Sequence, residues 1–455
     1  MLKPACTIIF LAPLASAAVI FAQTVSSPQK SVVAEKMFAQ VRTAVDQIYP
    51  ACEKLYMHLH QNPELSLQEE KTAARLAQEL QQCGFAITTK IGGYGFAGLM
   101  KNGEGPVVMV RTDLDALPVI ENTGLIYASK VRTKDERGNE VGVMHACGHD
   151  VHMTVFAGVA KILSQMKEQW RGTLLFVGQP AEERGAGARA MLADGLFTRF
   201  PRPHFALALH ANATLPAGKL AYCAGYALAN VNSVDLTIRG VGGHGAYPHT
   251  AKDPIVLAAQ VILALQTIVS REIKPLEPAV VTVGAIHGGA KHNIIPDEVK
   301  MQLTLRSYSE DVREQTLAAI RRIVKGLAEA AGVPVDRMPI VEVQDEFTPS
   351  TYNDPELVAR LAPVFAQMLG NENVAATEPV MGGEDFGQYG RVDPKIPINI
   401  FWLGTVAAGK WAESKRLGTT LPALHSNFFS PEPQLTIKTG IKTMAAAVLE
   451  LLERN

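Results

Sequence analysis

Residues 174–183 read LLFVGQPAEE, a short run of large apolar side chains followed by a turn with two adjacent glutamates. A second run, FALAL at residues 205–209, leads directly to His210. Runs that are apolar at every position are typical of central strands covered on both faces. Because such runs alternate with segments of helical spacing, the sequence predicts an α/β fold with an open, mostly parallel sheet. In these sheets the reactive groups lie at the carboxyl ends of strands.

The densest group of reactive side chains lies shortly before the first run. Residues 143–152 read VMHACGHDVH, and Gly148 lets the backbone turn sharply enough for Cys147 and His149 to address one point. A thiolate and a neutral imidazole suit Zn, Co, Ni or Mn, and Asp150 could orient either ligand by a hydrogen bond. A buried cysteine or a histidine near a helix start is usually structural, so this segment alone does not establish a metal site.

Further candidate ligands lie at later strand ends and near the C-terminus: Glu182, Glu183, His210 and His425. Together with the first group they favour a dinuclear hydrolase site. A Glu-Glu pair is usually part of a solvated loop, but the apolar strand before this pair favours a cleft. Adjacent glutamates point in different directions, so one can bind metal while the other accepts a proton from water.

The first 22 residues have the pattern of a secretory signal peptide, with one Lys3, a long apolar run and small residues before a polar segment. Cleavage is expected after Ala22, with Ala17 as the second choice. The sequence therefore predicts a secreted or periplasmic protein. About 430 residues remain, a length that suggests two domains or one domain with a large insertion.

Composition excludes several classes of partner. The net charge is -1 and the basic residues are scattered, so there is no electrostatic footprint for nucleic acid or anionic lipid. We expect no second apolar stretch long enough to span a bilayer, and hence a small-molecule partner and no membrane association after signal cleavage. The mature cysteines are too few for a disulfide scaffold. Pairing of Cys52 with Cys83 stays open.

A separate unit is expected between residues 230 and 343. Its pattern is strand, helix, strand, strand, helix, strand, the βαββαβ order of a ferredoxin-like two-layer sandwich. Cys147 precedes this unit and His425 follows it. We therefore predict an insertion between two halves, residues 31–229 and 344–455, of one metal-binding catalytic domain. Earlier in the chain, SLQE at residues 66–69 predicts a capping box at a helix start.

Five motifs occur in a fixed order: MHACGHD at 144–150, QPAEE at 179–183, GHGAYPH at 243–249, MGGEDF at 381–386 and LHS at 424–426. This order resembles the M20 metallopeptidase family, in the amidohydrolase branch that includes hippurate hydrolases and indole-acetyl amino acid hydrolases. The resemblance covers nearly all of the mature chain. It implies two divalent metal ions per subunit, Zn, Mn, Co or Ni, and Glu182 as the general base. The ligands that it implies are Cys147, His149, Glu183, His210 and His425.

The resemblance also assigns roles in the inserted unit. It implies that His244 enters the active site of a partner subunit and stabilises the oxyanion of the scissile carbonyl. Asn293 and Arg306 are candidates for binding the substrate carboxylate, because guanidinium pairs well with it. Composition alone would make His244 a surface histidine and Arg306 a surface charge. The unit is expected to act as a lid and to form a homodimer through its strand 231–239 or its helix 253–270.

The chain departs from the wider family at Asp113-Leu114-Asp115. Many members have His-x-Asp there, with the histidine as a ligand. Cys147 and His149 are expected to compensate for the missing donor, so Asp113 and Asp115 are interpreted as structural or orienting residues, although either could still touch a metal. The remaining histidines are interpreted as structural: His58, His60, His145, His152, His204, His249, His287 and His292.

The sequence thus predicts a metal-dependent amidohydrolase that cleaves an N-acyl amino acid, or a dipeptide-like substrate, with a metal-activated water and Glu182 as the base. One alternative is a dipeptidase or carboxypeptidase for unmodified peptides. A second is a catalytically inactive, metal-dependent binding protein. A third is a hydrolase that uses Cys147 as its nucleophile. A Ser-His-Asp enzyme is not indicated, because the chain has no nucleophile-elbow motif.

Overall fold

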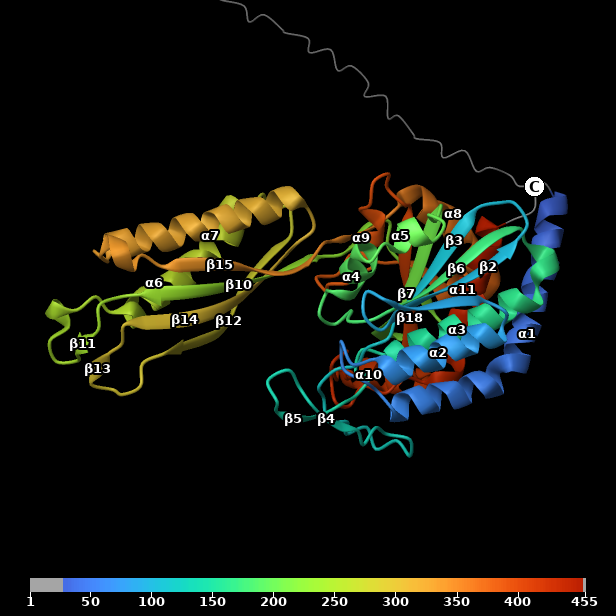
Figure 1. Cartoon of the computed structure of the whole chain (residues 1–455), viewed down its shortest axis with the longest axis horizontal. Coiled ribbons are helices and arrows are strands. Elements are labelled where there is room, and N and C mark those ends of the chain that lie inside the picture. The colour runs from blue at the N-terminus through green and yellow to red at the C-terminus, as the bar shows by residue number, and fades with distance from the viewer. Residues whose placement is uncertain (1–27, 453–455) are drawn as a thin grey trace, which may run out of the picture.

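The computed structural model describes residues 28–452, so the predicted signal peptide lies outside the described residues. The described chain has two parts: an α/β part built on an eight-stranded sheet, and a smaller part, here called the lid, whose four-stranded sheet is formed within residues 230–348 (Figure 1). The α/β part is formed by the segments before and after the lid. The predicted fold class is therefore confirmed.

The eight-stranded sheet is mixed: its centre is parallel, β1, β2 and β8 join it by antiparallel pairing, and the edge strand β17 runs parallel to β8. Its order is β1-β2-β6-β3-β7-β18-β8-β17, and neighbours from β6 to β18 run parallel. The strands are β1 (Ala86–Ile91), β2 (Gly95–Asn102), β3 (Val107–Asp113), β6 (Gly172–Gln179), β7 (Phe205–Pro216), β8 (Leu220–Tyr222), β17 (Val374–Ala376) and β18 (Ile398–Val406).

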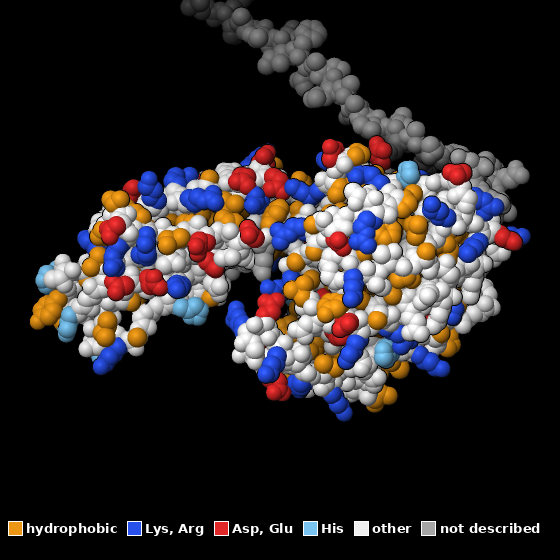
Figure 2. Space-filling model, in the orientation of Figure 1, with side chains coloured by type: hydrophobic (Ala, Val, Ile, Leu, Met, Phe, Trp, Pro, Cys, Tyr) orange, Lys and Arg blue, Asp and Glu red, His pale blue; other side chains and the backbone are white. Residues whose placement is uncertain are grey.

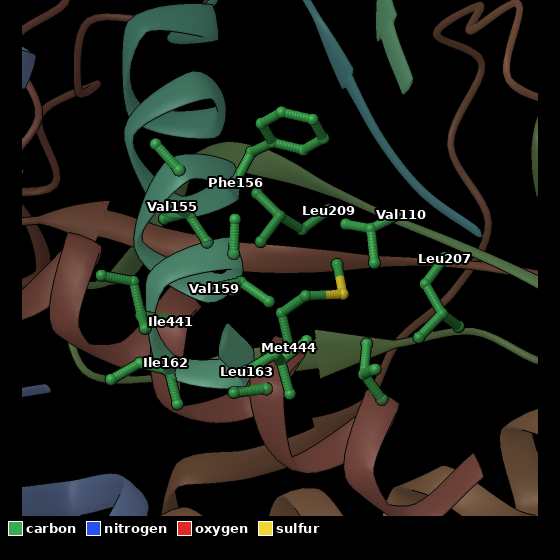
Figure 3. Close-up of a cluster of buried hydrophobic side chains, with 14 of the residues drawn as sticks. Val110, Val155, Phe156, Val159, Ile162, Leu163, Leu207, Leu209, Ile441 and Met444 are labelled. Carbon is green, nitrogen blue, oxygen red and sulfur yellow. The ribbon is translucent and has the colours of Figure 1, made fainter. Parts of the chain in front are cut away.

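Helices cover both faces of this sheet, which explains its apolar strands. Every residue of β3, β6 and β18 is buried. Figure 3 shows side chains of β3 and β7 packed against α3 and α11. One face is covered by α1 (Pro28–Gln61), α2 (Glu70–Gln82), α3 (His149–Gln165), α8 (Pro355–Leu369) and α11 (Pro433–Leu451). The other is covered by α4 (Gly187–Ala193), α5 (Leu196–Arg199) and α9 (Gly387–Gly390).

Local sequence signals place several helix starts. α8 and α11 each begin with proline, and the acidic residue before it, Asp354 or Glu432, accepts a hydrogen bond from a backbone N–H of the first turn. In the lid, Asp253 and Ser309 cap their helices in the same way. These caps satisfy N–H groups that a helix cannot satisfy internally.

The lid is a two-layer sandwich with the predicted element order. Its antiparallel sheet has the order β12-β14-β10-β15, and its two helices pack on one face. The elements are β10 (Asn230–Arg239), α6 (Pro254–Thr267), β12 (Ala279–Gly288), β14 (Glu298–Ser307), α7 (Glu310–Ala330) and β15 (Ile340–Thr348). Because β10 is paired on both sides, the expectation that strand 231–239 could pair across a two-fold axis is wrong.

Helix α6 contradicts the expectation about apolar stretches of membrane-spanning length. With the π-helical turn η3 (Ile268–Glu272) it forms a helix of 19 residues and hydropathy 1.6, long and apolar enough to cross a membrane by length and composition. The expectation that no second stretch would reach this length is therefore wrong. One side of α6 packs on the lid sheet through Leu257, Val261 and Leu265. The other side exposes apolar side chains, with Leu263 at 72% and Val256 at 55% exposure.

Two short strands, β9 (Gly225–Leu228) and β16 (Thr351–Asn353), pair antiparallel where the chain enters and leaves the lid. The remaining short strands are β4 (Arg132–Lys134), β5 (Glu140–Gly142), β11 (Gly243–His244) and β13 (Ile294–Ile295). The remaining helical elements are α10 (Ala408–Leu417) and the 3-10 turns η1 (Lys167–Gln169), η2 (Pro248–Thr250), η4 (Val335–Arg337) and η5 (Asn371–Asn373).

Cys52 and Cys83 are both free thiols, so they are not paired in the structure.

Candidate functional site

Cys147 and His149 lie at the amino-terminal end of α3, on either side of Gly148. Gly148 has a φ of 84°, in the left-handed region. A Cβ atom at this position would lie 2.9 Å from the Cβ of Ala211 on β7. Both the backbone conformation and the available space therefore favour glycine. The turn presents the two buried side chains to one point, as the sequence predicted.

The five side chains predicted as metal ligands form two groups that share Cys147. The ligand atoms of Cys147, His149 and His210 lie within 4.8 Å of one another, and so do those of Cys147, Glu183 and His425. The Sγ atom of Cys147 is 3.6 Å from Nε2 of His210 and 3.3 Å from Nε2 of His425. Nε2 of His425 is 3.6 Å from Oε1 of Glu183. Three other segments, which carry Glu183, His210 and His425, thus converge on the segment that holds the thiol.

Backbone carbonyl groups orient two of the imidazole rings. Nδ1 of His149 donates to the backbone oxygen of Asp115 at 2.8 Å, and Nδ1 of His210 donates to the backbone oxygen of Ala211 at 2.8 Å. With Nδ1 protonated, the lone pair of each ring is on Nε2, which points to the other ligands. These are the acceptors that the sequence could not identify.

His425 reaches the group from the loop after α10. Its φ of 68° lies in the left-handed region, and its backbone N–H donates to the oxygen of Ala146 at 2.8 Å. This bond ties the loop to the segment that holds Cys147. The His425 side chain is 55% exposed, so it lies on the open side of the group.

The arrangement fits divalent cations. Nε2 of His149 and Oε1 of Glu183 are buried and have no hydrogen-bond partner within the described part of the chain. Burial alone would lower the pKa of His149, but the charges of Asp113, Asp115 and Glu183 raise it to about 10. Burial and the charges of Glu183 and Glu182 hold the pKa of the Cys147 thiol well above its ordinary value. The centre thus favours a positive charge among these atoms, which a metal ion would supply.

Glu182 lies beside the ligand groups. Its Oε2 is 3.8 Å from Nε2 of His149, and its side chain is 8% exposed. Burial, followed by the charges of Glu384 and Glu183, raises the pKa of Glu182 well above its ordinary value. A carboxyl group of raised pKa holds a proton more firmly, which suits a group that takes a proton from water and passes it on.

A buried network under Glu182 was not foreseen. Arg111 on β3 donates to Asp113 at 2.9 Å and forms ion pairs with Glu384 at 2.9 Å and Asp385 at 3.1 Å. Its Nε donates to Oε1 of Gln179 at 2.9 Å. The charge of Arg111 offsets part of the negative charge of these carboxylates, which reduces the repulsion within the buried acidic cluster. The signal in the sequence was a lone arginine at the end of an apolar strand; Glu384 and Asp385 entered only as part of a motif.

Asp113 lies beside the ligand His149, and the backbone of Asp115 orients the ring of His149. Oδ1 of Asp113 accepts from Nδ1 of His152 at 2.9 Å, and Oδ2 of Asp113 lies 3.7 Å from Nε2 of His149. His152 in turn accepts from the backbone N–H of Ala211 at 2.8 Å. Ligand atoms of Asp113, His149 and His152 also lie within 4.8 Å of one another.

Asp150 has a different partner from the one expected. Oδ2 of Asp150 lies 2.7 Å from Nδ1 of His60, and Nε2 of His60 lies 3.1 Å from Oε1 of Glu121. Against the effect of burial, these two carboxylates raise the pKa of His60 to about 9. The structure thus pairs Asp150 with an imidazolium, and the expectation that it would orient Cys147 or His149 is wrong.

Comparison with known proteins agrees with this geometry. Residues 109–417 match peptidase family M20/M25/M40. An N-acetyldiaminopimelate deacetylase of Leuconostoc citreum is 39% identical over 351 residues, 76% of this chain and 86% of the relative. The thermostable carboxypeptidase 1 of Saccharolobus solfataricus is 34% identical over 375 residues, 82% of this chain and 89% of the relative.

This chain belongs to the M20 family. A solved structure of a Bacillus subtilis protein, described as a dinuclear metal binding peptidase from the M20 family, covers 90% of this chain and 99% of its own with 28% identity and a TM-score of 0.71. The protein is therefore a metal-dependent hydrolase of the amidohydrolase and peptidase type, and it uses divalent metal ions.

Two of the three lid residues lie far from the metal ligands of this M20 enzyme. His244 on β11 and Asn293 beside β13 are exposed at the end of the lid that points away from the α/β part (Figure 1). Arg306, near the other end of the lid, is half-buried and donates to the backbone oxygen of Met381 at 3.5 Å. Within one chain, only Arg306 thus lies next to the α/β part.

A cleft of about 1030 Å³ separates the lid from the α/β part of the M20 enzyme, and Figure 2 shows the molecule hollowed at this place. Glu183 lies on one wall, beside Arg184, which pairs with Glu136 of the β4–β5 hairpin at 2.9 Å. The helix-free face of the lid sheet forms the other wall. Most of the side chains that line it are polar, among them Ser233, Asp235, Gln302, Thr304 and Gln344.

Proposed function

We propose that the protein hydrolyses the amide bond of N-acyl amino acids, with Glu182 as the general base. The observation that carries this proposal is the pair of ligand groups sharing Cys147, with the Glu182 carboxylate 3.8 Å from His149. The N-acetyldiaminopimelate deacetylase named above acts on a substrate of this class. The acyl group and the amino acid side chain depend on the shape of the cleft.

Cys147 with His149 and His210 would hold one divalent ion, and Cys147 with Glu183 and His425 a second. Bound there, the ions would lower the pKa of water and polarise the scissile carbonyl group. A thiolate with imidazole and carboxylate ligands suits Zn, Mn, Co or Ni. In this proposal Glu182 accepts the proton of the attacking water and delivers it to the nitrogen of the leaving amino acid.

We assign recognition of the substrate carboxylate to Arg306 and Asn293. The guanidinium group of Arg306 donates to Thr304 at 3.2 Å and to Met381 at 3.5 Å, which leaves further N–H groups for a ligand. Its position at the edge of the α/β part suits a substrate lying in the cleft. Asn293 lies far from the cleft of its own chain, so its role requires a second subunit.

We infer that two copies of the lid form a homodimer through α6 and the edge strand β12. α6 exposes apolar side chains at Ile255, Val256 and Leu263, and β12 has one unpaired edge. Burial of apolar surface and extension of the sheet would both stabilise such a pair. His244, exposed at the far end of the lid, would then complete the active site of the partner by donating to the oxyanion.

Mixing two inactive variants tests the shared site. Hybrids of Glu182→Gln and His244→Ala subunits contain one site with both native residues, so mixing should restore about a quarter of the wild-type activity. A strictly monomeric protein in sedimentation, or no recovery in verified hybrids, would refute the shared site.

Leu263→Asp should weaken the dimer. Val335→Asp, at an 87% exposed position of η4, serves as a control for surface charge.

A carboxypeptidase or dipeptidase is the second candidate, because one relative carries the name carboxypeptidase. The deciding experiment compares an N-acyl amino acid with the matching dipeptide that has a free amino group. The protein is stripped of metal and reloaded with Zn, Mn, Co or Ni, and its metal content is measured. A higher kcat/KM for the N-acyl substrate supports the proposal, whereas a higher value for the dipeptide favours the peptidase.

We also propose that the protein is exported and that its mature chain begins near Gln23. The support is the pattern of residues 1–22 in the sequence. Fractionation of the source cells and sequencing of the mature N-terminus test this proposal. Recovery of the chain from the cytoplasm with residues 1–22 intact would contradict it.

A further inference from the structure

The segment before α2 uses its acidic residues differently from the predicted capping box. α2 begins at Glu70, and the side chain of Glu69 makes no capping bond to it. Instead Oε2 of Glu64 accepts from the backbone N–H and the hydroxyl of Thr72, both at 2.8 Å. The hydroxyl of Ser66 donates to Oδ2 of Asp115 at 2.6 Å. The capping-box prediction is therefore wrong, and Glu69 is available for another contact.

Glu69 reaches the turn that carries the general base. It is fully buried, and its Oε1 accepts from the backbone N–H of Leu67 at 2.9 Å and from that of Ala181 at 2.8 Å. Ala181 immediately precedes Glu182. Its φ is 49°, in the left-handed region that residues other than glycine rarely adopt. Ala181 is 1% exposed, so bulk solvent does not compete for this N–H group. The hydrogen bond thus stabilises an unfavourable backbone conformation next to Glu182.

A second buried carboxylate holds the other side of Glu182. Oδ2 of Asp115 accepts from the backbone N–H of Glu183 at 3.0 Å. The N–H groups before and after Glu182 are therefore both fixed by carboxylates from other segments. Since the direction of a side chain depends on its backbone, these two bonds set where the Glu182 carboxylate lies relative to His149.

We propose that Glu69 is a positioning residue for the general base, acting through the N–H of Ala181. The inference rests on the proposed role of Glu182. A merely structural Glu69 would support the fold without affecting the turn selectively. Oε2 of Glu69 has no hydrogen-bond partner within the described part of the chain, so the single acceptor Oε1 performs the contact.

Two variants of Glu69 separate the effect of its hydrogen-bond acceptor from the effect of its side-chain volume. Glu69→Gln retains an oxygen that can accept from both N–H groups, whereas Glu69→Leu fills a similar volume without an acceptor. Glu69→Leu should lower kcat about 10- to 100-fold with little change in KM, because a small displacement of a catalytic group has effects of that size. Glu69→Gln should retain most of kcat. Glu64→Leu is the matched control, because the side chain of Glu64 accepts from Thr72 of α2 instead of from the turn that carries Glu182.

Amide hydrogen exchange of the metal-free protein gives a readout that does not depend on activity. Glu69→Leu should speed exchange in residues 181–187, and Glu64→Leu should speed it in residues 70–76 only. Unchanged exchange in residues 181–187, or an equal loss of kcat in Glu64→Leu, would overturn the proposal. If Glu69→Leu fails to fold, Glu69→Gln decides: a kcat loss as large as 10-fold would overturn it. If Glu182→Gln retains the wild-type rate, the proposed function is wrong. The exchange result still tests the contact between Glu69 and the N–H of Ala181.

Discussion

Nε2 of His425 lies 3.3 Å from Sγ of Cys147, although 278 positions separate them in the chain. The lid accounts for much of this separation, because its sheet and helices are inserted between the segments that carry the two residues. The chain returns from the lid to add β18 to the sheet beside β7, and the loop after α10 brings His425 to the thiol. Since Cys147 belongs to both ligand groups, we expect its loss to affect metal binding more than the loss of His210 or His425.

Cys147→Ala should therefore reduce the content of both metal ions, whereas His425→Ala should reduce mainly one. His425 takes part in one group only, and Cys147 takes part in both. Elemental analysis after dialysis against a defined metal concentration measures the stoichiometry. Cys223→Ala is the control, because Cys223 is also buried and free but lies outside the ligand groups. Equal stoichiometry in Cys147→Ala and wild type would contradict a shared thiolate.

Removal of metal should abolish hydrolysis, and readdition of Zn or Mn should restore it. A hydrolase with Cys147 as nucleophile would instead survive chelation. The surroundings disfavour that alternative, because burial and nearby carboxylates hold the thiol pKa well above its ordinary value. Activity is measured before chelation, after it and after reloading. Full activity in metal-free protein, verified by elemental analysis, would exclude a metal-activated mechanism.

Glu182→Gln should lower kcat about 100- to 10,000-fold, the usual contribution of a general base, while both ions remain bound. Glutamine has nearly the same shape but cannot accept the proton. Glu413→Gln on the exposed helix α10 is the control for loss of one carboxylate. The measurement pairs steady-state kinetics with metal content in the same preparation. A rate close to wild type would remove Glu182 from the reaction and end the proposed mechanism.

The sequence predicted the site best where reactive side chains follow apolar strands. The apolar runs at residues 174–177 and 205–209 lie in β6 and β7, and the side chains expected to meet at the sheet edge do meet. Such short runs favour a strand covered on both faces, because a buried helix is usually longer. His210 lies within β7 and not after it, since polar residues extend the strand to Pro216.

The details that failed depend on tertiary contacts. Asp150 is adjacent to a ligand in sequence, yet it pairs with His60, which lies 90 positions away. Glu69 has the spacing of a capping residue, yet its partner is Ala181. Neither contact leaves a local pattern, because each joins segments that are brought together only by packing of the helices on the sheet. The backbone acceptor for His149 is invisible for the same reason: every residue has a carbonyl group.

The buried contact of His60 predicts a dependence of stability on alkaline pH. Asp150 and Glu121 raise the pKa of His60 to about 9 in the folded protein, from an ordinary value of 6.5. Below pH 6.5 the folded and the unfolded forms both carry the proton, so the stabilisation is fully present. Between pH 6.5 and about 9 the unfolded chain loses this proton while the folded protein keeps it, so stability falls.

Urea unfolding of wild type and His60→Gln at a series of pH values measures this effect. The free energy of unfolding of wild type, relative to the variant, should decrease by about 3 kcal/mol as pH rises through this window. The comparison with His60→Gln cancels titrations elsewhere, including that of His149. His204→Gln serves as the control, because Nδ1 of His204 accepts from the backbone N–H of Val107, whereas both ring nitrogens of His60 face carboxylates. A difference between wild type and His60→Gln that stays constant from pH 6 to 9.5 would mean that His60 is neutral in the folded protein, and the contact with Asp150 would then be an ordinary hydrogen bond.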